Sequence, residues 1–297
     1  MKSIKRFSVL LALLLALTMT AAACGEEEPT TSAGGAEEEE ASEGEEPTYV
    51  TEGQLTVGSD IPYPPFEFED AGTLTGFDVD IVREIADKLG VENPDEAWIS
   101  TDFGTIFTQL ASGTKFDIVA AAVTAYAPEG TPAAETVAER VEVVDFSVPF
   151  YPSLQSLTVD SEANPDITGV DALPEGAKVG VQRATTGAFY AEEELTGAEL
   201  VSFEKAPQMY QQLQAGSLDA IFNDLPVTLE SIKDKPGLEV VEQVETGEEY
   251  AIAVSKDNPA LLEEINAALK EMFDDGTYAE IYSKYFPEQV LPDYASE

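Results

Sequence analysis

The 297-residue sequence predicts an α/β fold, because apolar strands alternate with amphipathic helices along most of the chain. A short strand at residues 55–57 is followed by a helix, a second helix and a mainly apolar run at residues 116–123. Apolar runs at residues 178–181 and 218–222 belong to a second series of the same kind. This order builds parallel sheets, and about 245 residues are enough for one large domain or two lobes.

The helix after the first strand is expected at residues 78–89. Its apolar residues recur every four positions, and Gly90 provides a stop signal. Asp78 and Asp80 lie near the start of this helix, where a carboxylate suits the positive end of the helix dipole. We therefore expect both aspartates to have structural roles rather than to contact a ligand.

The later elements follow the same pattern. A helix at about residues 105–112 precedes the buried strand, and two helices of the second series end at Gly197 and Gly216. A strand is expected at residues 250–254. The last helix is expected at residues 259–275, with Pro at its start and an apolar stripe along one side.

The loop between the first strand and its helix is the clearest sign of a ligand site. Residues 58–68 place aromatic rings and the carboxylate of Asp60 on a segment stiffened by prolines. Open α/β sheets bind their ligands just beyond the carboxyl ends of the strands. The loop is therefore predicted to be one wall of a small-molecule pocket.

The N-terminus predicts export. Three basic residues precede an apolar run at residues 7–17, and small residues then lead to Cys24. This run is too short for a membrane span, which needs about 20 apolar residues, so residues 1–23 are predicted to be a signal peptide. Cys24 is the only cysteine and has the position of the lipid-modified, palmitate-bearing cysteine of bacterial lipoproteins. The alternative is a signal peptide cut nearby, with Cys24 incidental.

Residues 24–52 are rich in Glu, Gly, Ser, Thr and Pro, which predicts a disordered acidic linker after the lipid-bearing cysteine. The whole chain has a formal net charge of −43. A surface this acidic repels nucleic acid and anionic lipid headgroups, so we expect no nucleic-acid partner, and contact with the membrane through the anchor only.

The absence of histidine narrows the possible chemistry. With no histidine and one cysteine, the chain lacks the residues of serine–histidine and cysteine–histidine nucleophile systems and offers little for a transition metal. We expect no cofactor, no metal site and no catalytic residue. Acid catalysis by a carboxylate stays open.

The aromatic loop and the segment that starts at Gly76-Phe77-Asp78 together resemble the amino-acid-binding family of ABC-importer solute-binding proteins, many of them bacterial lipoproteins. The resemblance continues almost to the C-terminus. It implies a type II periplasmic-binding-protein fold, with two α/β lobes joined by a two-strand hinge. The lobe boundaries it implies are residues 53–155 and 248–297 for lobe 1 and residues 156–247 for lobe 2.

The same resemblance implies a set of ligand contacts. In the family an arginine binds the ligand carboxylate and an aspartate binds the ammonium, while two aromatic rings enclose the side chain. The corresponding residues here are Asp60, Tyr63, Phe103, Ala122, Thr124, Arg140, Thr185, Thr186 and Asp224. Structural alternatives exist for three of them. Arg140 could neutralise neighbouring glutamates on the surface, and Asp224 and Thr185 could cap helices.

Two departures from the family pattern affect the substrate. An extra segment at residues 126–135 separates Thr124 from Arg140 and is expected to form a loop at the pocket mouth. Ala184 replaces a common glycine. Asp60 occupies the position where relatives that bind basic amino acids contact the distal cation, which favours a polar or positively charged ligand side chain.

The predicted function is a solute-binding protein, lipid-anchored on the extracellular face of the membrane or periplasmic, and monomeric. It captures a free amino acid by lobe closure and delivers it to an ABC permease and ATPase. A ligand-sensing receptor subunit is the first alternative. A dehydratase-type enzyme on the same fold is the second.

Overall fold

The computed structural model describes residues 46–295. The chain divides into units of residues 1–43 and 44–297, and all the described residues belong to the second. The predicted signal peptide, Cys24 and most of the predicted linker lie outside them. In the described part, no helix combines the length and the apolar character needed to cross a membrane.

The first sheet has the strand order β4-β1-β5-β13-β7, and β1 runs parallel to β4 and β5. Its strands are β1 (Val57–Ser59), β4 (Trp98–Ser100), β5 (Ile118–Val119), β7 (Val144–Phe146) and β13 (Ala253–Ser255). Its helices are α1 (Phe77–Leu89), α2 (Ile106–Ala111), α3 (Pro132–Val143), α7 (Pro259–Asp275) and α8 (Thr277–Tyr285). Because β13 pairs with β5 and β7, the C-terminal part of the chain returns to this first lobe.

The second sheet has the order β10-β9-β11-β8-β12-β6. Its strands are β6 (Thr124–Tyr126), β8 (Tyr151–Asp160), β9 (Lys178–Gln182), β10 (Glu199–Phe203), β11 (Ala220–Asp224) and β12 (Leu238–Tyr250). Three helices belong to this lobe: α4 (Thr186–Glu194), α5 (Ala206–Gln214) and α6 (Leu225–Ile232). The two parallel strands beside β9 complete a second α/β lobe.

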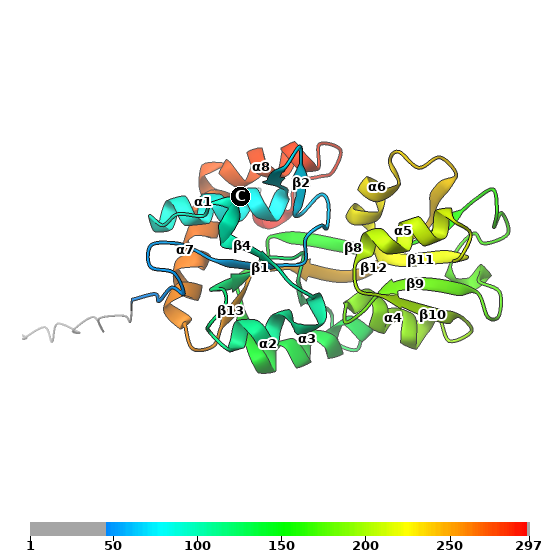
Figure 1. Ribbon diagram of the computed structural model, residues 1–297, viewed down its shortest axis with the longest axis horizontal. Coiled ribbons are helices and arrows are strands. Elements are labelled where there is room, and N and C mark those ends of the chain that lie inside the picture. The colour runs from blue at the N-terminus through cyan, green and yellow to red at the C-terminus, as the bar shows by residue number, and fades with distance from the viewer. Residues whose placement is uncertain (1–45, 296–297) are drawn as a thin grey trace, which may run out of the picture. The chain divides into compact units, whose positions relative to one another are not determined.

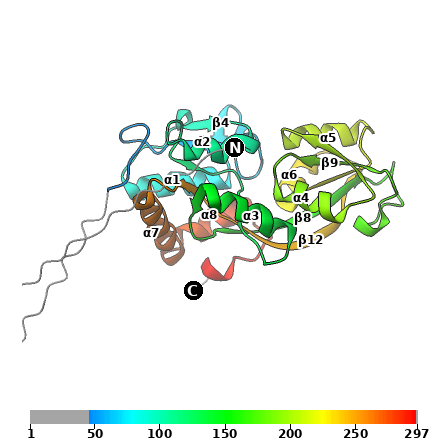
Figure 2. The ribbon, with the colours of Figure 1, turned by 90° about the horizontal axis from the view of Figure 1, so that it is seen from below.

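The long strands β8 and β12 connect the lobes. They pair antiparallel from Tyr151 and Tyr250 at one end to Asp160 and Leu238 at the other. Figures 1 and 2 show them side by side, leading from the elements of the first lobe to α4, α5 and α6. The predicted fold class, two α/β lobes joined by two strands, is confirmed.

Several predicted boundaries are wrong. The apolar run at residues 116–123 is buried, but only Ile118–Val119 within it forms a strand. Strand β10 is absent from the prediction. The segment at residues 126–135 is only partly a loop, since Pro132 begins α3 and Thr131 accepts a capping hydrogen bond from the Ala134 N–H at 3.3 Å. This helix carries Arg140.

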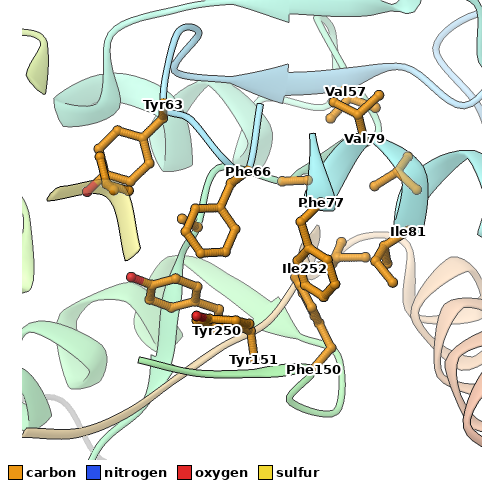
Figure 3. Packing of buried hydrophobic residues seen from close by; sticks show 14 of the residues in the cluster. Val57, Tyr63, Phe66, Phe77, Val79, Ile81, Phe150, Tyr151, Tyr250 and Ile252 are labelled. Atoms are coloured by element: carbon orange, nitrogen blue, oxygen red, sulfur yellow. The ribbon is translucent and has the colours of Figure 1, made fainter. Parts of the chain in front are cut away.

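An aromatic cluster holds the predicted ligand loop against the connecting strands. The Phe66 ring lies edge-on to Tyr151 and Tyr250, with centroid distances of 5.1 and 5.4 Å (Figure 3). Phe77, the first residue of α1, packs at 5.7 Å from the Tyr151 ring. Each such pair contributes roughly 0.5–1.5 kcal/mol beyond its buried area. The loop is therefore fixed to the same strands that join the lobes.

Candidate ligand-binding site

The candidate site is a pocket between the two lobes, at the carboxyl ends of β1, β9 and β11. Eleven residues line it: Asp60, Tyr63, Phe103, Ala121, Ala122, Thr124, Arg140, Gln182, Thr185, Thr186 and Asp224. All nine residues predicted from the sequence are among them. Ala121 and Gln182 were missed, although Gln182 follows the predicted strand at residues 178–181 directly and could have been found from that position.

Arg140 extends from α3 and is 5% exposed. Its Nη1 donates to the Thr124 carbonyl at 2.7 Å, and its guanidinium carbon lies 5.4 and 5.2 Å from the ring centroids of Phe103 and Phe107. Within residues 46–295, no carboxylate lies within 4.0 Å of a guanidinium nitrogen of Arg140. The alternative of a surface arginine paired with its neighbouring glutamates is therefore wrong.

Burial lowers the pKa of Arg140 to about 10, and the nearby carboxylates of Glu248 and Asp224 offset part of that shift. The side chain stays charged at neutral pH. A buried cation without an anionic partner is costly, so the pocket attracts an anion to this guanidinium. The planar fork of an arginine suits a carboxylate best, because it can donate two parallel hydrogen bonds.

Asp224 ends β11 on the opposite side of the pocket. Its Oδ2 accepts hydrogen bonds from the hydroxyls of Tyr63 at 2.6 Å and Tyr250 at 2.7 Å, and its Oδ1 accepts one from Gln155 Nε2 at 2.6 Å. Its side chain makes no capping hydrogen bond to α6, so the capping alternative finds no support. Burial, followed by repulsion from Glu248, raises the pKa of Asp224 to about 6.

Glu248, from β12, is an unpredicted buried acid next to the pocket. Its Oε2 accepts hydrogen bonds from the hydroxyls of Thr124 and Thr186, both at 2.6 Å, and it is 1% exposed. A hydroxyl has one proton to donate. With that proton directed at Glu248, each threonine offers only lone pairs to a ligand. The two hydroxyls therefore favour an ammonium group over a carboxylate.

The backbone around the pocket is strained at two alanines. Ala122 has φ 47°, and its N–H donates to Oδ2 of buried Asp78 at 2.9 Å. Ala184 has φ 63°, in the left-handed region where a glycine is common and alanine costs roughly 1 kcal/mol. Asp78 was predicted to have a structural role, and this contact defines that role: its carboxylate holds the turn that forms the pocket floor.

Thr185 caps α4, accepting a hydrogen bond from the Ala188 N–H at 3.2 Å, and it also lines the pocket.

The far end of the pocket is built from both lobes. Asp60 follows β1, is 3% exposed, and forms an ion pair with Lys205 from the second lobe. Its Oδ2 also accepts a hydrogen bond from Gln182 Nε2 at 2.6 Å. At the rim, Arg183 pairs with Asp102 at 2.9 Å. These contacts, together with the bond between Tyr63 and Asp224, join the two lobes across the pocket, so the structure is a closed form.

Comparisons with known proteins agree with this architecture. Residues 55–288 match the family model described as bacterial extracellular solute-binding proteins, family 3. The chain is 31% identical over 252 residues to the L-cystine-binding protein TcyJ of Escherichia coli (strain K12), covering 84% of this chain and 89% of that protein.

Two solved structures are also similar. An ancestral arginine-binding protein bound to glutamine is 38% identical with a TM-score of 0.71, and the match covers 80% of this chain and 100% of that one. The ancestral amino-acid-binding protein AncCDT-1, a precursor of cyclohexadienyl dehydratase, is 34% identical with a TM-score of 0.68, covering 79% of this chain and 95% of that one.

Proposed function

Since the chain belongs to family 3 of the bacterial extracellular solute-binding proteins, we propose that it captures a free α-amino acid and delivers it to an ABC importer. One observation carries the proposal. Arg140 and Asp224 are opposite charges in one buried pocket, and neither has an ion-pair partner within 4.0 Å in residues 46–295. An α-amino acid has a carboxylate and an ammonium on one carbon, so it compensates both charges at once. A neutral sugar compensates neither.

In the proposed complex, Arg140 binds the ligand carboxylate through two parallel hydrogen bonds. Asp224 binds the ammonium, and Thr124 and Thr186, whose own protons are donated to Glu248, accept its remaining protons. Tyr63 and Phe103 flank the ligand side chain, which extends toward Asp60. The backbone of Ala122 and of the Thr185 turn completes the enclosure.

Lobe movement is the proposed mechanism of capture. β8 and β12 act as the hinge, lobe 1 comprises residues 53–155 and 248–297, and lobe 2 comprises residues 156–247. The ligand docks on one lobe of the open protein and closure buries it. The closed, monomeric protein then meets the permease, which forms the importer with its ATPase.

The proposed location is the extracellular face of the cell membrane, reached through a signal peptide, a lipid on Cys24 and the acidic linker. The anchor has a direct test. In the native host, Cys24→Ser should release the protein from the membrane fraction, and labelled palmitate should be incorporated into the parent protein only. A Cys24→Ser protein that stays in the membrane fraction would contradict the anchor.

The proposed activity is binding without turnover. A dehydratase-type enzyme is the second candidate. Two observations favour it: the pKa of Asp224 is raised to about 6, and the chain is similar to AncCDT-1. Incubating the protein with each ligand that it binds and following the mixture by NMR distinguishes the two. Product formation would make the protein an enzyme. A receptor subunit instead of an importer component would be indicated by a gene neighbourhood without a permease and an ATPase.

The first test is a thermal-shift screen of the purified protein, unfolded and refolded to remove carried-over ligand. The panel comprises the standard amino acids, ornithine, citrulline, polyamines and simple sugars. A ligand at a hundredfold excess over its dissociation constant stabilises the folded state by about 2.7 kcal/mol, which raises the melting temperature measurably. A shift with one or a few α-amino acids supports the proposal. Shifts with sugars or polyamines alone would contradict it.

A further inference from the structure

The side-chain end of the pocket already contains a cation. Lys205 lies just before α5 in the second lobe, and its Nζ pairs with Oδ1 of Asp60 in the first lobe. The same Nζ donates to the carbonyls of Ile61 at 3.2 Å and Thr101 at 3.3 Å. An ammonium has three protons, so these three oxygen atoms use all of them. Lys205 is thus fully coordinated by the first lobe.

This arrangement removes the charge that a basic ligand needs. Asp60 is the pocket carboxylate at this end, and its charge is compensated from within the protein. Nearby Asp102 is paired with Arg183. Glu67 is fully buried, and its burial, together with repulsion from Asp78 and Asp60, raises the pKa of its carboxyl group well above its usual value. The carboxylates of Asp60 and Asp102 at this end of the pocket are therefore both paired with cations of the second lobe.

Gln182 supplies the remaining polarity. Its Nε2 donates to Oδ2 of Asp60 at 2.6 Å and to the Glu204 carbonyl at 3.3 Å. Both partners only accept, which fixes the orientation of the amide. Its Oε1 is buried in the pocket wall and has no hydrogen-bond partner in the described part of the chain. A buried acceptor without a donor destabilises the protein, and a ligand N–H or O–H would remove that cost.

We propose that Lys205 and Gln182 determine the substrate class, and that the ligand is an amino acid whose neutral side chain ends in a hydrogen-bond donor, such as a carboxamide or a hydroxyl. Lys205 occupies the place of a distal ligand cation and excludes arginine, lysine and ornithine. Gln182 Oε1 receives the donor. The proposal rests on the proposed function and reverses the expectation, drawn from Asp60 alone, that a positively charged side chain fits.

The test is isothermal titration of the full mature protein, refolded to remove bound ligand, with L-glutamine, L-glutamate, L-leucine, L-arginine and L-lysine. Glutamine should bind at least tenfold more tightly than each of the others. Lys205→Met keeps the length of the side chain but leaves Asp60 uncompensated. This variant should shift the ratio of arginine to glutamine affinity at least tenfold toward arginine.

Lys256→Met is the matched control, because it also breaks a lysine–aspartate pair, with Asp145 at 2.6 Å, but within the first lobe and away from the pocket. It should leave the selectivity unchanged. If Lys205→Met does not fold, Gln182→Leu serves instead. Loss of the acceptor should weaken glutamine binding about tenfold with little change for leucine.

The outcomes separate this inference from the proposed function. A parent protein that prefers arginine or lysine would overturn the inference and leave amino-acid capture standing, and so would preference for leucine or glutamate. Glutamine binding with no change of selectivity in Lys205→Met would remove the role of Lys205. Failure of these five and of every other standard amino acid to bind, in a protein whose melting curve shows that it is folded, would reject both proposals.

Discussion

The two ends of the pocket differ in where their charges find partners. At one end, Arg140 and Asp224 are buried ions without ion-pair partners in the described residues. At the other end, Asp60 is equally buried but is neutralised by Lys205 from the opposite lobe. A charge left uncompensated in a protein interior is costly. The unpaired end is therefore built for a charged part of the ligand, and the paired end for a neutral one.

The difference also separates affinity from selectivity. A ligand gains most where it supplies the missing partner of a buried charge, because the protein has already lost the hydration of that group. At the paired end a ligand gains only the hydrogen bonds that the protein leaves open. Substitutions at the first end should thus affect every amino acid alike, while those at the second should change which amino acid binds.

The largest effect is expected for Arg140→Ala. Loss of the guanidinium leaves the ligand carboxylate buried without a partner, which costs about 2–5 kcal/mol of binding free energy. Titration calorimetry with the best ligand measures it. Arg83→Ala is the control, because Arg83 pairs with Asp95 on the partly exposed side of α1, far from the pocket lining. An Arg140→Ala protein that binds within about threefold of the parent would exclude Arg140 from the site.

Acidification should act through Asp224. Its folded-state pKa of about 6 lies above the ordinary value of 3.8, so the native state retains the proton longer than the unfolded state. The free energy of unfolding of the ligand-free protein should therefore decrease as the pH rises from about 4 to 6, and ionisation of Asp224 should account for about 3 kcal/mol of this decrease. The stability difference between the parent and Asp224→Asn, measured by denaturant unfolding without ligand, should follow this curve.

Ligand affinity should have the opposite pH dependence, because the ammonium binds the ionised carboxylate. Below pH about 6, the affinity of the parent should fall by up to tenfold per pH unit, while Asp224→Asn binds weakly and without this slope. Asp145→Asn, an exposed pair with Lys256, is the control for a general charge effect. A parent affinity that is constant from pH 4 to 7 would contradict the ammonium contact.

A smaller effect is expected for Asp60→Asn. The ion pair with Lys205 exists between lobes, so its loss weakens the closed state and raises the apparent dissociation constant. Because the Lys205 side chain is 28% exposed, the loss should be about 1 kcal/mol, or roughly fivefold for the best ligand. A hundredfold loss confined to arginine or lysine would mean that Asp60 binds a ligand cation directly.

Local motifs predicted the pocket well, and for a physical reason. Contacts such as Asp60, Thr186 and Asp224 lie in the segments that follow predicted strands, and the carboxyl ends of parallel strands meet along one edge of the sheet. The helix at residues 78–89 could be predicted because its stripe and stop glycine are local signals. Residues 126–135 could be predicted only as an extra segment, since Pro128 and Gly130 indicate a loop and the alanines after Pro132 give no helical periodicity.

The contacts that sequence reasoning missed depend on lobe closure. The chain has several lysines, and Lys205 lies in an ordinary surface segment. Only the approach of the lobes brings it to Asp60. Glu248 is one glutamate among several in β12, and its burial follows from the strand's position beside the pocket. No local pattern distinguishes such residues, because their roles come from segments more than 50 residues away.

The smallest effect is expected for Arg183→Ala. This variant tests whether an ion pair between the lobes stabilises the closed state simply because it joins them, or only when it is also buried. Arg183 and Asp102 join the lobes at 2.9 Å, as Lys205 and Asp60 do, but the Arg183 side chain is 53% exposed. Water and salt screen such a pair, so its loss should change the binding free energy by less than about 0.5 kcal/mol, or about twofold. Titrations of the parent and the variant at 50 and 500 mM salt measure the difference, which should disappear at the higher concentration. A loss as large as that of Asp60→Asn, and insensitive to salt, would mean that bridging the lobes matters more than burial.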